Sequence, residues 1–89
     1  MTHKDMVNML LLAGGEMIIG YSWCRMDFRI GSKEEVYLFW WGGREEVKLP
    51  DSYAGSNRYV INAASTFKTI ESADTPKGAY DNLISILYA

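Results

Sequence analysis

The sequence predicts an α+β domain: an N-terminal helix, an antiparallel meander of three to five strands, and a C-terminal helix packed on the sheet. Three observations predict this fold class. Apolar residues recur at helical spacing near both ends of the chain, and they alternate with a period of two between residues 16 and 49. Glycine-rich turns separate the alternating segments. With 89 residues the chain can build one hydrophobic core, so residues 1–89 are expected to form a single compact domain.

The first helix is expected over residues 3–13. Thr2 is placed to cap it, and Asp5, three positions later, is placed to complete a capping box. Gly14–Gly15 follows the last apolar residue, which is typical of a helix C-terminus. Apolar residues form a wide face on this helix, and Leu12 departs from the pattern by falling on the polar side.

Two strands are expected in the segment that follows. Apolar residues take the odd positions over Met17–Trp23 and the even positions over Cys24–Ile30. A regular strand cannot change its buried face, so this change of parity requires a tight turn or a β-bulge. We favour a turn near Ser22–Arg25 that separates two strands.

The strongest strand pattern is Glu35–Trp41, which is rich in aromatic residues. A hairpin turn at Gly31–Lys33 is expected to join it to the preceding strand. Gly42–Arg44 predicts a further turn into a strand over Glu45–Leu49, and residues 50–57 have the composition of a loop.

Residues 58–72 fit either strands or a helix. Arg58–Ile61 is typical of a strand, whereas Ala63, Phe67 and other apolar residues share helical spacing. We favour a short strand near 58–62 and a second near 66–71.

The last helix is expected over residues 76–88. Thr75 followed by Pro76 is typical of a helix start. Apolar residues including Ala79, Leu83 and Leu87 share one face, so this helix should pack on the sheet.

Charge and cysteine content argue against several classes of protein. The formal net charge is -2, with a pI of about 5.2, whereas proteins that hold nucleic acid through its phosphates usually carry a basic patch. Cys24 is the only cysteine and His3 the only histidine, so neither an intrachain disulfide nor a zinc site is expected. The uninterrupted apolar run Met9–Ala13 is too short for a signal peptide or a membrane span. We therefore expect a cytoplasmic protein with no cofactor, no bound metal and no membrane association.

The sequence does not predict an enzyme. His3 lies at a terminus that is expected to be mobile, and a Cys24–His3 pair requires the first helix to start beside the strand turn. Glu34–Glu35 and Glu45–Glu46 resemble paired catalytic carboxylates, but adjacent strand residues point to opposite faces. We interpret these glutamates as solubilising charges at strand ends.

The aromatic strand supplies the candidate binding residues. Both of its faces carry large apolar groups, and two short helices can barely shield both faces of a meander. The second face is therefore either covered by sheet curvature or exposed as an interaction site. The candidate binding residues are Tyr37, Phe39, Trp41, Trp23 and Arg44.

These observations favour a non-enzymatic module that binds another protein through the aromatic sheet face, or that forms a homodimer. By analogy, small acidic domains of this kind include accessory and inhibitor proteins of phages and other mobile elements. The alternative is a small-ligand or single-stranded nucleic-acid binding domain that uses the same aromatic residues with Arg25, Arg29 and Arg44. Asp27 and Glu35 lie among these arginines and would repel phosphates.

The order of helix, strands and C-terminal helix is similar to that of double-stranded-RNA-binding domains. Those domains carry a lysine-rich start to the last helix, whereas Thr75–Asp81 offers one lysine and an aspartate. The resemblance is therefore one of topology only and implies no RNA partner.

Overall fold

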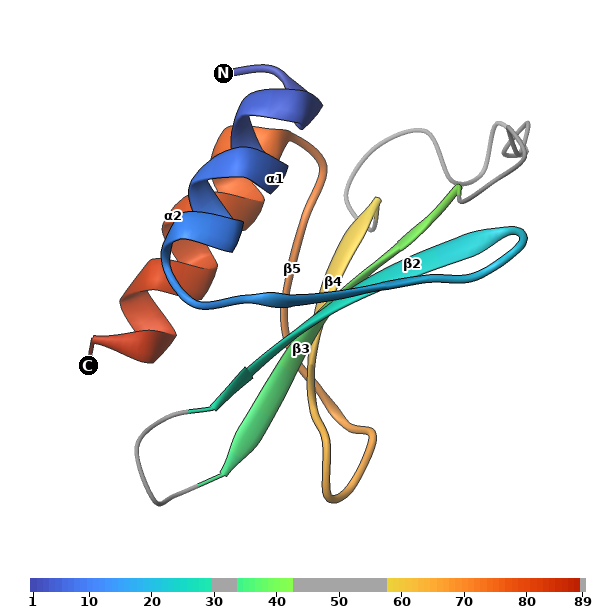
Figure 1. The fold of residues 1–89 in the computed structure, drawn as a ribbon. Coiled ribbons are helices and arrows are strands. Elements are labelled where there is room, and N and C mark those ends of the chain that lie inside the picture. Colours follow the sequence, from blue (N-terminus) through green and yellow to red (C-terminus); the bar gives the residue numbers. More distant parts are fainter. Residues whose placement is uncertain (30–33, 43–57, 89) are drawn as a thin grey trace.

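The computed structural model describes residues 1–29, 34–42 and 58–88. Its elements, in chain order, are α1 (His3–Leu12), β1 (Glu16–Ile19), β2 (Trp23–Arg29), β3 (Glu35–Trp41), β4 (Tyr59–Ala63), β5 (Thr69–Ala73) and α2 (Pro76–Leu87). The strands form one antiparallel sheet in the order β1-β2-β3-β4-β5. Both helices lie on one face of this sheet (Figure 1). The predicted fold class is confirmed.

Both helices begin where their capping residues predict. The Oγ1 of Thr2 accepts a hydrogen bond from the Asp5 backbone N–H (3.1 Å), and the Asp5 carboxylate accepts one from the Thr2 N–H (3.0 Å). The Oγ1 of Thr75 accepts from the Gly78 N–H (3.0 Å) at the start of α2. After α1 the chain turns at Gly14, whose φ of 99° favours glycine. Neither α1 nor α2, the helices of the described ranges, is long and apolar enough to cross a membrane.

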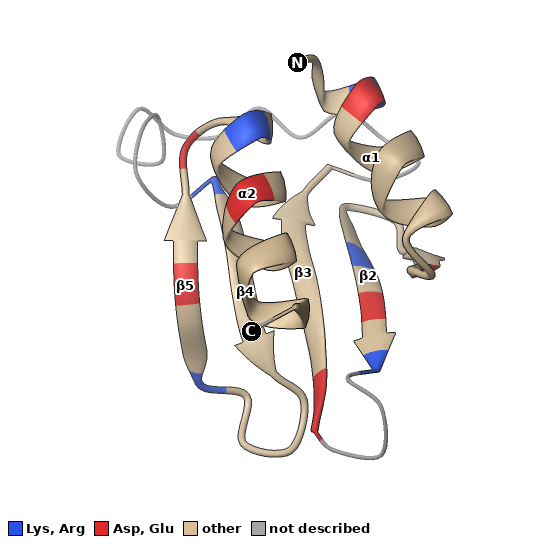
Figure 2. Cartoon of the chain, turned by 90° about the vertical axis from the view of Figure 1, so that its left-hand side faces the viewer, with Lys and Arg blue, Asp and Glu red and all other residues tan. Residues whose placement is uncertain are grey.

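The hydrophobic core lies between the helices and one face of the sheet, which we call the inner face; the opposite face is the outer face. Figure 2 shows both helices in front of the inner face. Opposed residues of antiparallel strands share a face, so Met26, Leu38 and Ile61 form one buried row across β2, β3 and β4. The buried core comprises Met6, Leu10, Cys24, Met26, Phe28, Val36, Leu38, Trp40, Tyr59, Ile61, Ala79 and Leu83.

The turn between β1 and β2 comes earlier than the sequence predicts. The chain reverses over residues 20–22, where the Gly20 N–H donates to the Trp23 carbonyl (2.8 Å), so the predicted turn at Ser22–Arg25 is wrong and Cys24 lies inside β2. Gly20 permits this early turn because a Cβ there would lie 2.7 Å from the Trp23 ring. Trp23 consequently points to the outer face, although its parity matches that of inner-face residues of β1.

Residues 58–72 form strands rather than a helix, as favoured. The first strand is β4, and the second, β5, starts three residues later than expected. The delay arises from a turn in which the Phe67 N–H donates to the Ala63 carbonyl (2.8 Å) and Phe67 adopts a φ of 57°. The pairing of β4 with β3 decides the ambiguity in favour of strand, because β3 offers a free edge for it.

Several predictions fall outside the described residues: the turn at Gly31–Lys33, the strand over Glu45–Leu49, the loop over 50–57, and all of the Gly42–Arg44 turn except Gly42. In the sheet, β3 has β2 on one side and β4 on the other.

Candidate functional site

The outer face of the sheet is the candidate site. The described helices both lie on the inner face, so neither crosses the outer one (Figure 2). Four of the five predicted binding residues point to this outer face: Trp23 lies opposite Trp41, and Tyr37 and Phe39 follow at alternate positions of β3. Arg44, the fifth, lies outside the described residues. The structure therefore brings the described candidates together on one surface.

Three of these residues, Trp23, Phe39 and Trp41, form what we call the aromatic cluster. The rings of Trp23 and Phe39 stack with their centroids 6.2 Å apart, and Phe39 meets Trp41 edge to face at 5.1 Å. Trp41 is 41% exposed, whereas the other two are half-buried. Such aromatic pairs stabilise by about 0.5–1.5 kcal/mol beyond the area they bury, so the cluster is held in place before any partner arrives.

The cluster is positioned by backbone at the ends of β2 and β3. Gly20 lies directly against the Trp23 ring, because even a Cβ on this residue would approach the ring to 2.7 Å. The Gly42 N–H donates to the Ser22 carbonyl (2.8 Å), which ties the chain after Trp41 to the turn before Trp23. These contacts hold the two tryptophans on neighbouring strands at the same end of the sheet.

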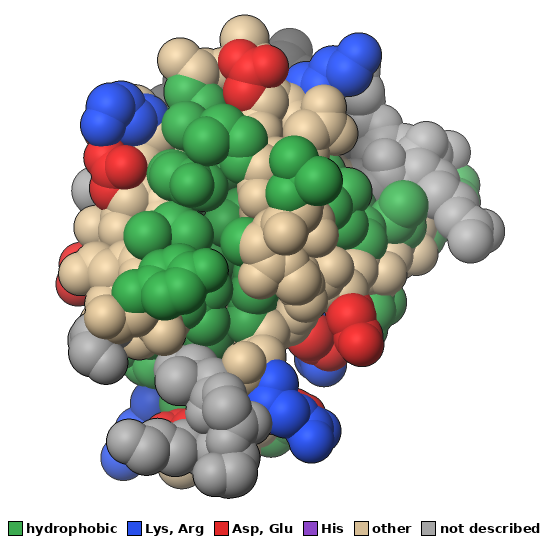
Figure 3. Space-filling model, turned by 60° about the vertical axis from the view of Figure 1, so that its left-hand side comes forward, with side chains coloured by type: hydrophobic (Ala, Val, Ile, Leu, Met, Phe, Trp, Pro, Cys, Tyr) green, Lys and Arg blue, Asp and Glu red, His purple; other side chains and the backbone are tan. Residues whose placement is uncertain are grey.

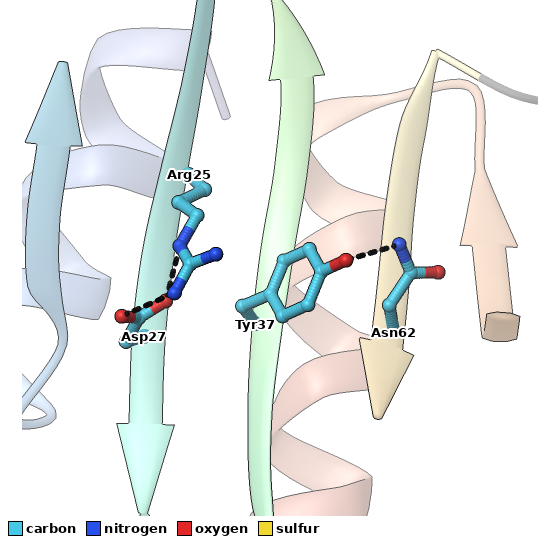
Figure 4. Close-up of polar contacts among 4 residues, drawn as sticks. All are labelled: Arg25, Asp27, Tyr37 and Asn62. Atoms are coloured by element: carbon cyan, nitrogen blue, oxygen red, sulfur yellow. Dashed lines mark hydrogen bonds and ion pairs between the residues drawn. The ribbon is translucent and has the colours of Figure 1, made fainter. Parts of the chain in front are cut away.

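A row of polar contacts crosses the outer face beside the cluster (Figure 4). We call Arg25, Asp27, Tyr37, Asn62 and Thr69 the polar row. Arg25 Nη2 donates to Asp27 Oδ2 (3.0 Å), and the guanidinium lies over the Tyr37 ring, 4.8 Å from its centroid. The Tyr37 hydroxyl accepts from Asn62 Nδ2 (3.1 Å), and Thr69 Oγ1 donates to Asn62 Oδ1 (3.0 Å). The row links four strands, β2 to β5.

The polar row pairs the charges in the middle of the outer face with each other and joins neighbouring strands by side-chain hydrogen bonds. Arg25 Nε and Asp27 Oδ1 lie 2.9 Å apart, but the Nε–H does not point at this oxygen well enough to form a hydrogen bond. Both atoms are shielded from solvent. Their shielding costs free energy that the ion pair and the ring contact offset. Tyr37 is buried although it is on the outer face, and the Arg25 guanidinium lies over its ring.

Arg29, the second arginine that β2 places on the outer face, is also paired. Arg29 forms an ion pair with Glu35 directly opposite on β3. The neighbouring Glu34 instead accepts a hydrogen bond from Ser65 Oγ (2.9 Å), so the two glutamates serve separate partners. Glu45–Glu46 lies outside the described residues. Within the described ranges, no group of three or more His, Cys, Asp or Glu side chains could hold a metal ion.

His3 is held by contacts that the sequence did not predict. Its Nδ1 lies 2.8 Å from the Tyr59 hydroxyl, its ring stacks on Tyr59 at 5.8 Å, and it meets the Trp40 ring edge-on at 5.2 Å. Burial, and to a smaller extent the positive charge of Arg58, lower the pKa of His3. The expectation of a mobile terminal histidine is therefore wrong: His3 ties the start of α1 to β4. Because 56 residues separate His3 from Tyr59, no local sequence pattern indicates this contact.

Cys24 does not meet His3 in the structure. Its side chain is buried on the inner face, and burial raises the pKa of the thiol. No hydrogen bond joins these two described residues, so the considered Cys24–His3 pair is not formed.

The helix side carries a second apolar surface, which the sequence did not single out. Figure 3 shows hydrophobic side chains gathered over the helices. The large exposed apolar residues on and beside the helices are Met9, Leu11, Leu12 and Tyr88. Unlike the aromatic cluster, these side chains have no ring contacts among the described residues that would fix them.

Comparison of the chain with protein-family models, with curated proteins and with solved structures found no match. The function is therefore inferred from the two faces of this sheet and from the residues that occupy them.

Proposed function

We propose that the protein acts by binding another protein through the outer face of its sheet, with the aromatic cluster at the centre of the contact. The observation that carries this proposal is the exposure of Trp41 beside half-buried Trp23 and Phe39 on a face that no described helix covers. Clustered apolar side chains exposed on a small domain are typical of interaction sites. In such sites tryptophan and tyrosine contribute a large share of the binding free energy.

The order of the cluster supports this role. The Phe39 ring contacts both tryptophan rings, and the turn at Gly20 braces Trp23, so few rotamers remain to be lost on binding. A surface that is already ordered binds with a smaller entropic cost than a mobile one. The rim is polar, since the polar row borders the cluster, and this combination of apolar centre and polar rim is common in protein interfaces.

The charges of the outer face favour a protein over a nucleic acid. Arg25 and Arg29 are both paired with carboxylates, so a phosphate would have to displace Asp27 or Glu35 from them. In this proposal the chain catalyses no reaction of its own. It acts in the cytoplasm by occupying a surface of its partner, as accessory and inhibitor proteins do.

Single substitutions on the two sides of the molecule test the proposal. Affinity capture with the wild-type chain identifies candidate partners, and titration with the purified partner then gives the dissociation constants of the variants. We expect Trp41→Ser and Phe39→Ser to weaken binding by about tenfold or more, as is typical when an aromatic anchor is removed. Leu12→Ser, which removes an exposed apolar side chain from the helix side, is the matched control and should leave binding unchanged. Equal affinities for all three variants would reject the outer face as the site.

The nucleic-acid alternative makes a different prediction. An oligonucleotide that stacks on the aromatic cluster would quench tryptophan fluorescence at low salt, and added salt would reverse the quenching. We expect no quenching at low salt, because the two arginines that β2 places on this face are both paired with carboxylates. Salt-sensitive quenching that Trp41→Ser abolishes would favour the alternative.

A further inference from the structure

We propose that two copies of this chain associate through the free edge of β1, with their β1 strands paired antiparallel about Ile18 so that two sheets become one. Edge strands present unpaired backbone N–H and C=O groups, to which another strand readily adds. In the described part of the chain β1 and β5 are the two edges of the sheet. Both the backbone and the side chains of β1 favour a second copy as the added strand.

The backbone groups at the free edge of β1 follow from the turn beyond it. In an antiparallel pair, positions that exchange hydrogen bonds with the neighbouring strand alternate with positions that do not. The Gly20 N–H donates to the Trp23 carbonyl, and the pairing of β1 with β2 continues from there without interruption. Ile18 therefore directs its backbone groups toward β2. Met17 and Ile19 direct theirs to the free edge.

This edge is self-complementary about Ile18. A two-fold axis at Ile18 sets Met17 of one copy opposite Ile19 of the other, and each such pair exchanges both of its free N–H and C=O groups. An axis at Met17 instead would require the N–H of Gly15, which already donates to the Leu10 carbonyl (3.0 Å). An axis at Ile19 would require the turn beyond β1. A symmetric contact of this kind uses the same edge in both copies and closes as a dimer.

The side chains of β1 suit the same register. Ile18 and Ile19 are 40% and 51% exposed. In the dimer Ile18 would contact Ile18 of the second copy on the outer face, and Ile19 would contact Met17 on the inner face. Glu16, the charged residue of β1, would face Gly20 of the second copy, so no like charges oppose each other. Apolar cross-strand pairs of this kind stabilise a sheet.

The opposite edge has protection that β1 lacks. Glu71 of β5 pairs with Ile61 and so shares the inner face with the core, and a bulge between Ile61 and Asn62 breaks the regular register. Inward-facing charges and bulges both oppose the addition of a further strand. By contrast, β1 pairs with β2 in an unbroken register and carries apolar side chains at every position after Glu16.

The dimer would be weak and independent of the proposed function. A pair of strands this short buries less surface than a typical stable interface, which buries about 1,200 Å² or more. We therefore expect a dissociation constant in the micromolar to millimolar range. A two-fold axis perpendicular to the sheet keeps both helix layers on one side and both aromatic clusters on the other. Each cluster remains open, and a partner with two binding surfaces would gain avidity.

Two measurements on the wild-type chain test the dimer and its register. Sedimentation velocity from low micromolar to millimolar concentration should show a shift from monomer to dimer. Amide hydrogen exchange at both concentrations should show slower exchange of the Met17 and Ile19 N–H groups in the concentrated sample, with the β5 amides unchanged. A monomer at every concentration, or slowing confined to β5, overturns the proposal.

Substitutions at Ile18 test the position of the axis. Ile18→Lys and Ile18→Glu should each weaken the dimer by about tenfold or more, because like charges then oppose each other across the axis. Mixing the two variants should restore dimers that contain one copy of each. Ile70→Lys is the matched control, since Ile70 is 45% exposed on β5, and it should dimerise like the wild type.

The outcomes of these variants also separate the dimer from the proposed function. Circular dichroism confirms that each variant is folded, and Trp41→Ser should dimerise normally whatever it does to partner binding. An Ile18→Lys chain that dimerises as well as the wild type contradicts the proposal. So does a mixture of the Lys and Glu variants that stays monomeric.

Discussion

Neighbouring residues of β3 have different roles because alternate side chains of a strand point to opposite faces. Leu38 is fully buried under the helices, whereas Trp41 is partly exposed on the outer face. We expect Leu38→Ala to lower the free energy of unfolding by about 2–5 kcal/mol, the usual cost of a cavity in a core. Trp41→Ser should cost less, about 1–2 kcal/mol, because it removes one edge-to-face ring contact and only part of the side chain is buried.

Urea unfolding followed by circular dichroism measures both values. Similar losses for Leu38→Ala and Trp41→Ser would contradict the assignment of the outer face as a surface rather than a second core.

His3 makes the stability of the fold depend on pH. Its pKa is lowered by burial and then by Arg58, so the folded chain binds fewer protons than the unfolded chain between that lowered pKa and the ordinary value of about 6.5. The contribution of neutral His3 is therefore complete above pH of about 6.5 and is lost as the pH falls through this window. The expected result is a lower free energy of unfolding at mildly acidic than at neutral pH.

A His3→Phe variant isolates this effect, because phenylalanine keeps a ring against Tyr59 and Trp40 but cannot titrate. Thermal unfolding of both chains over the same pH range should give a shallower slope for the variant. Identical slopes would show that His3 does not titrate differently on folding. Asp5, whose pKa is lowered chiefly by its hydrogen bonds with Thr2, acts only at more acidic pH and is present in both chains.

At the scale of the element, α2 depends on its first turn. The Thr75 hydroxyl accepts the Gly78 N–H, which has no partner inside the helix. We expect Thr75→Ala to lower the free energy of unfolding by about 1 kcal/mol. Thr75→Ser retains the hydroxyl and is the control. Equal unfolding midpoints for Thr75→Ala and the wild type would show that the cap contributes nothing to stability.

Elements with local signals could be predicted from the sequence. The caps Thr2 and Thr75 place both helix starts correctly, and the run of apolar and aromatic residues identifies β3. The turn after β1 could not be placed, because the early reversal depends on the contact of Gly20 with the Trp23 ring. Residues 58–72 were ambiguous for a similar reason: β4 is a strand because β3 provides its partner.

At the scale of the whole molecule, the sequence indicated two apolar faces of β3 but not which of them the helices cover. Both faces carry large side chains, so alternation alone does not distinguish core from surface. The structure resolves the question because α1 and α2 both lie on the inner face, which leaves Trp23, Phe39 and Trp41 on the other. The polar row and the His3 contacts join distant segments and have no local signal.

The arrangement separates three surfaces by face and edge. Among the described residues, the helix side has a patch of apolar side chains, the β1 edge has backbone groups without a strand partner, and the outer face has the ordered aromatic cluster. The proposed partner site and the proposed dimer therefore do not compete for the same residues. Pairing through β1 would place two outer faces side by side.

Hydroxyl-radical footprinting of the complex with the captured partner tests the central claim most directly, because it reports on all of these surfaces at once. The side chains of Trp23, Phe39 and Trp41 should become protected from oxidation when the partner binds. Leu12 and Tyr88 on the helix side should remain as reactive as in the free chain. Protection of these helix-side residues, with the aromatic cluster as reactive as before, would contradict the assignment of the outer face as the binding site.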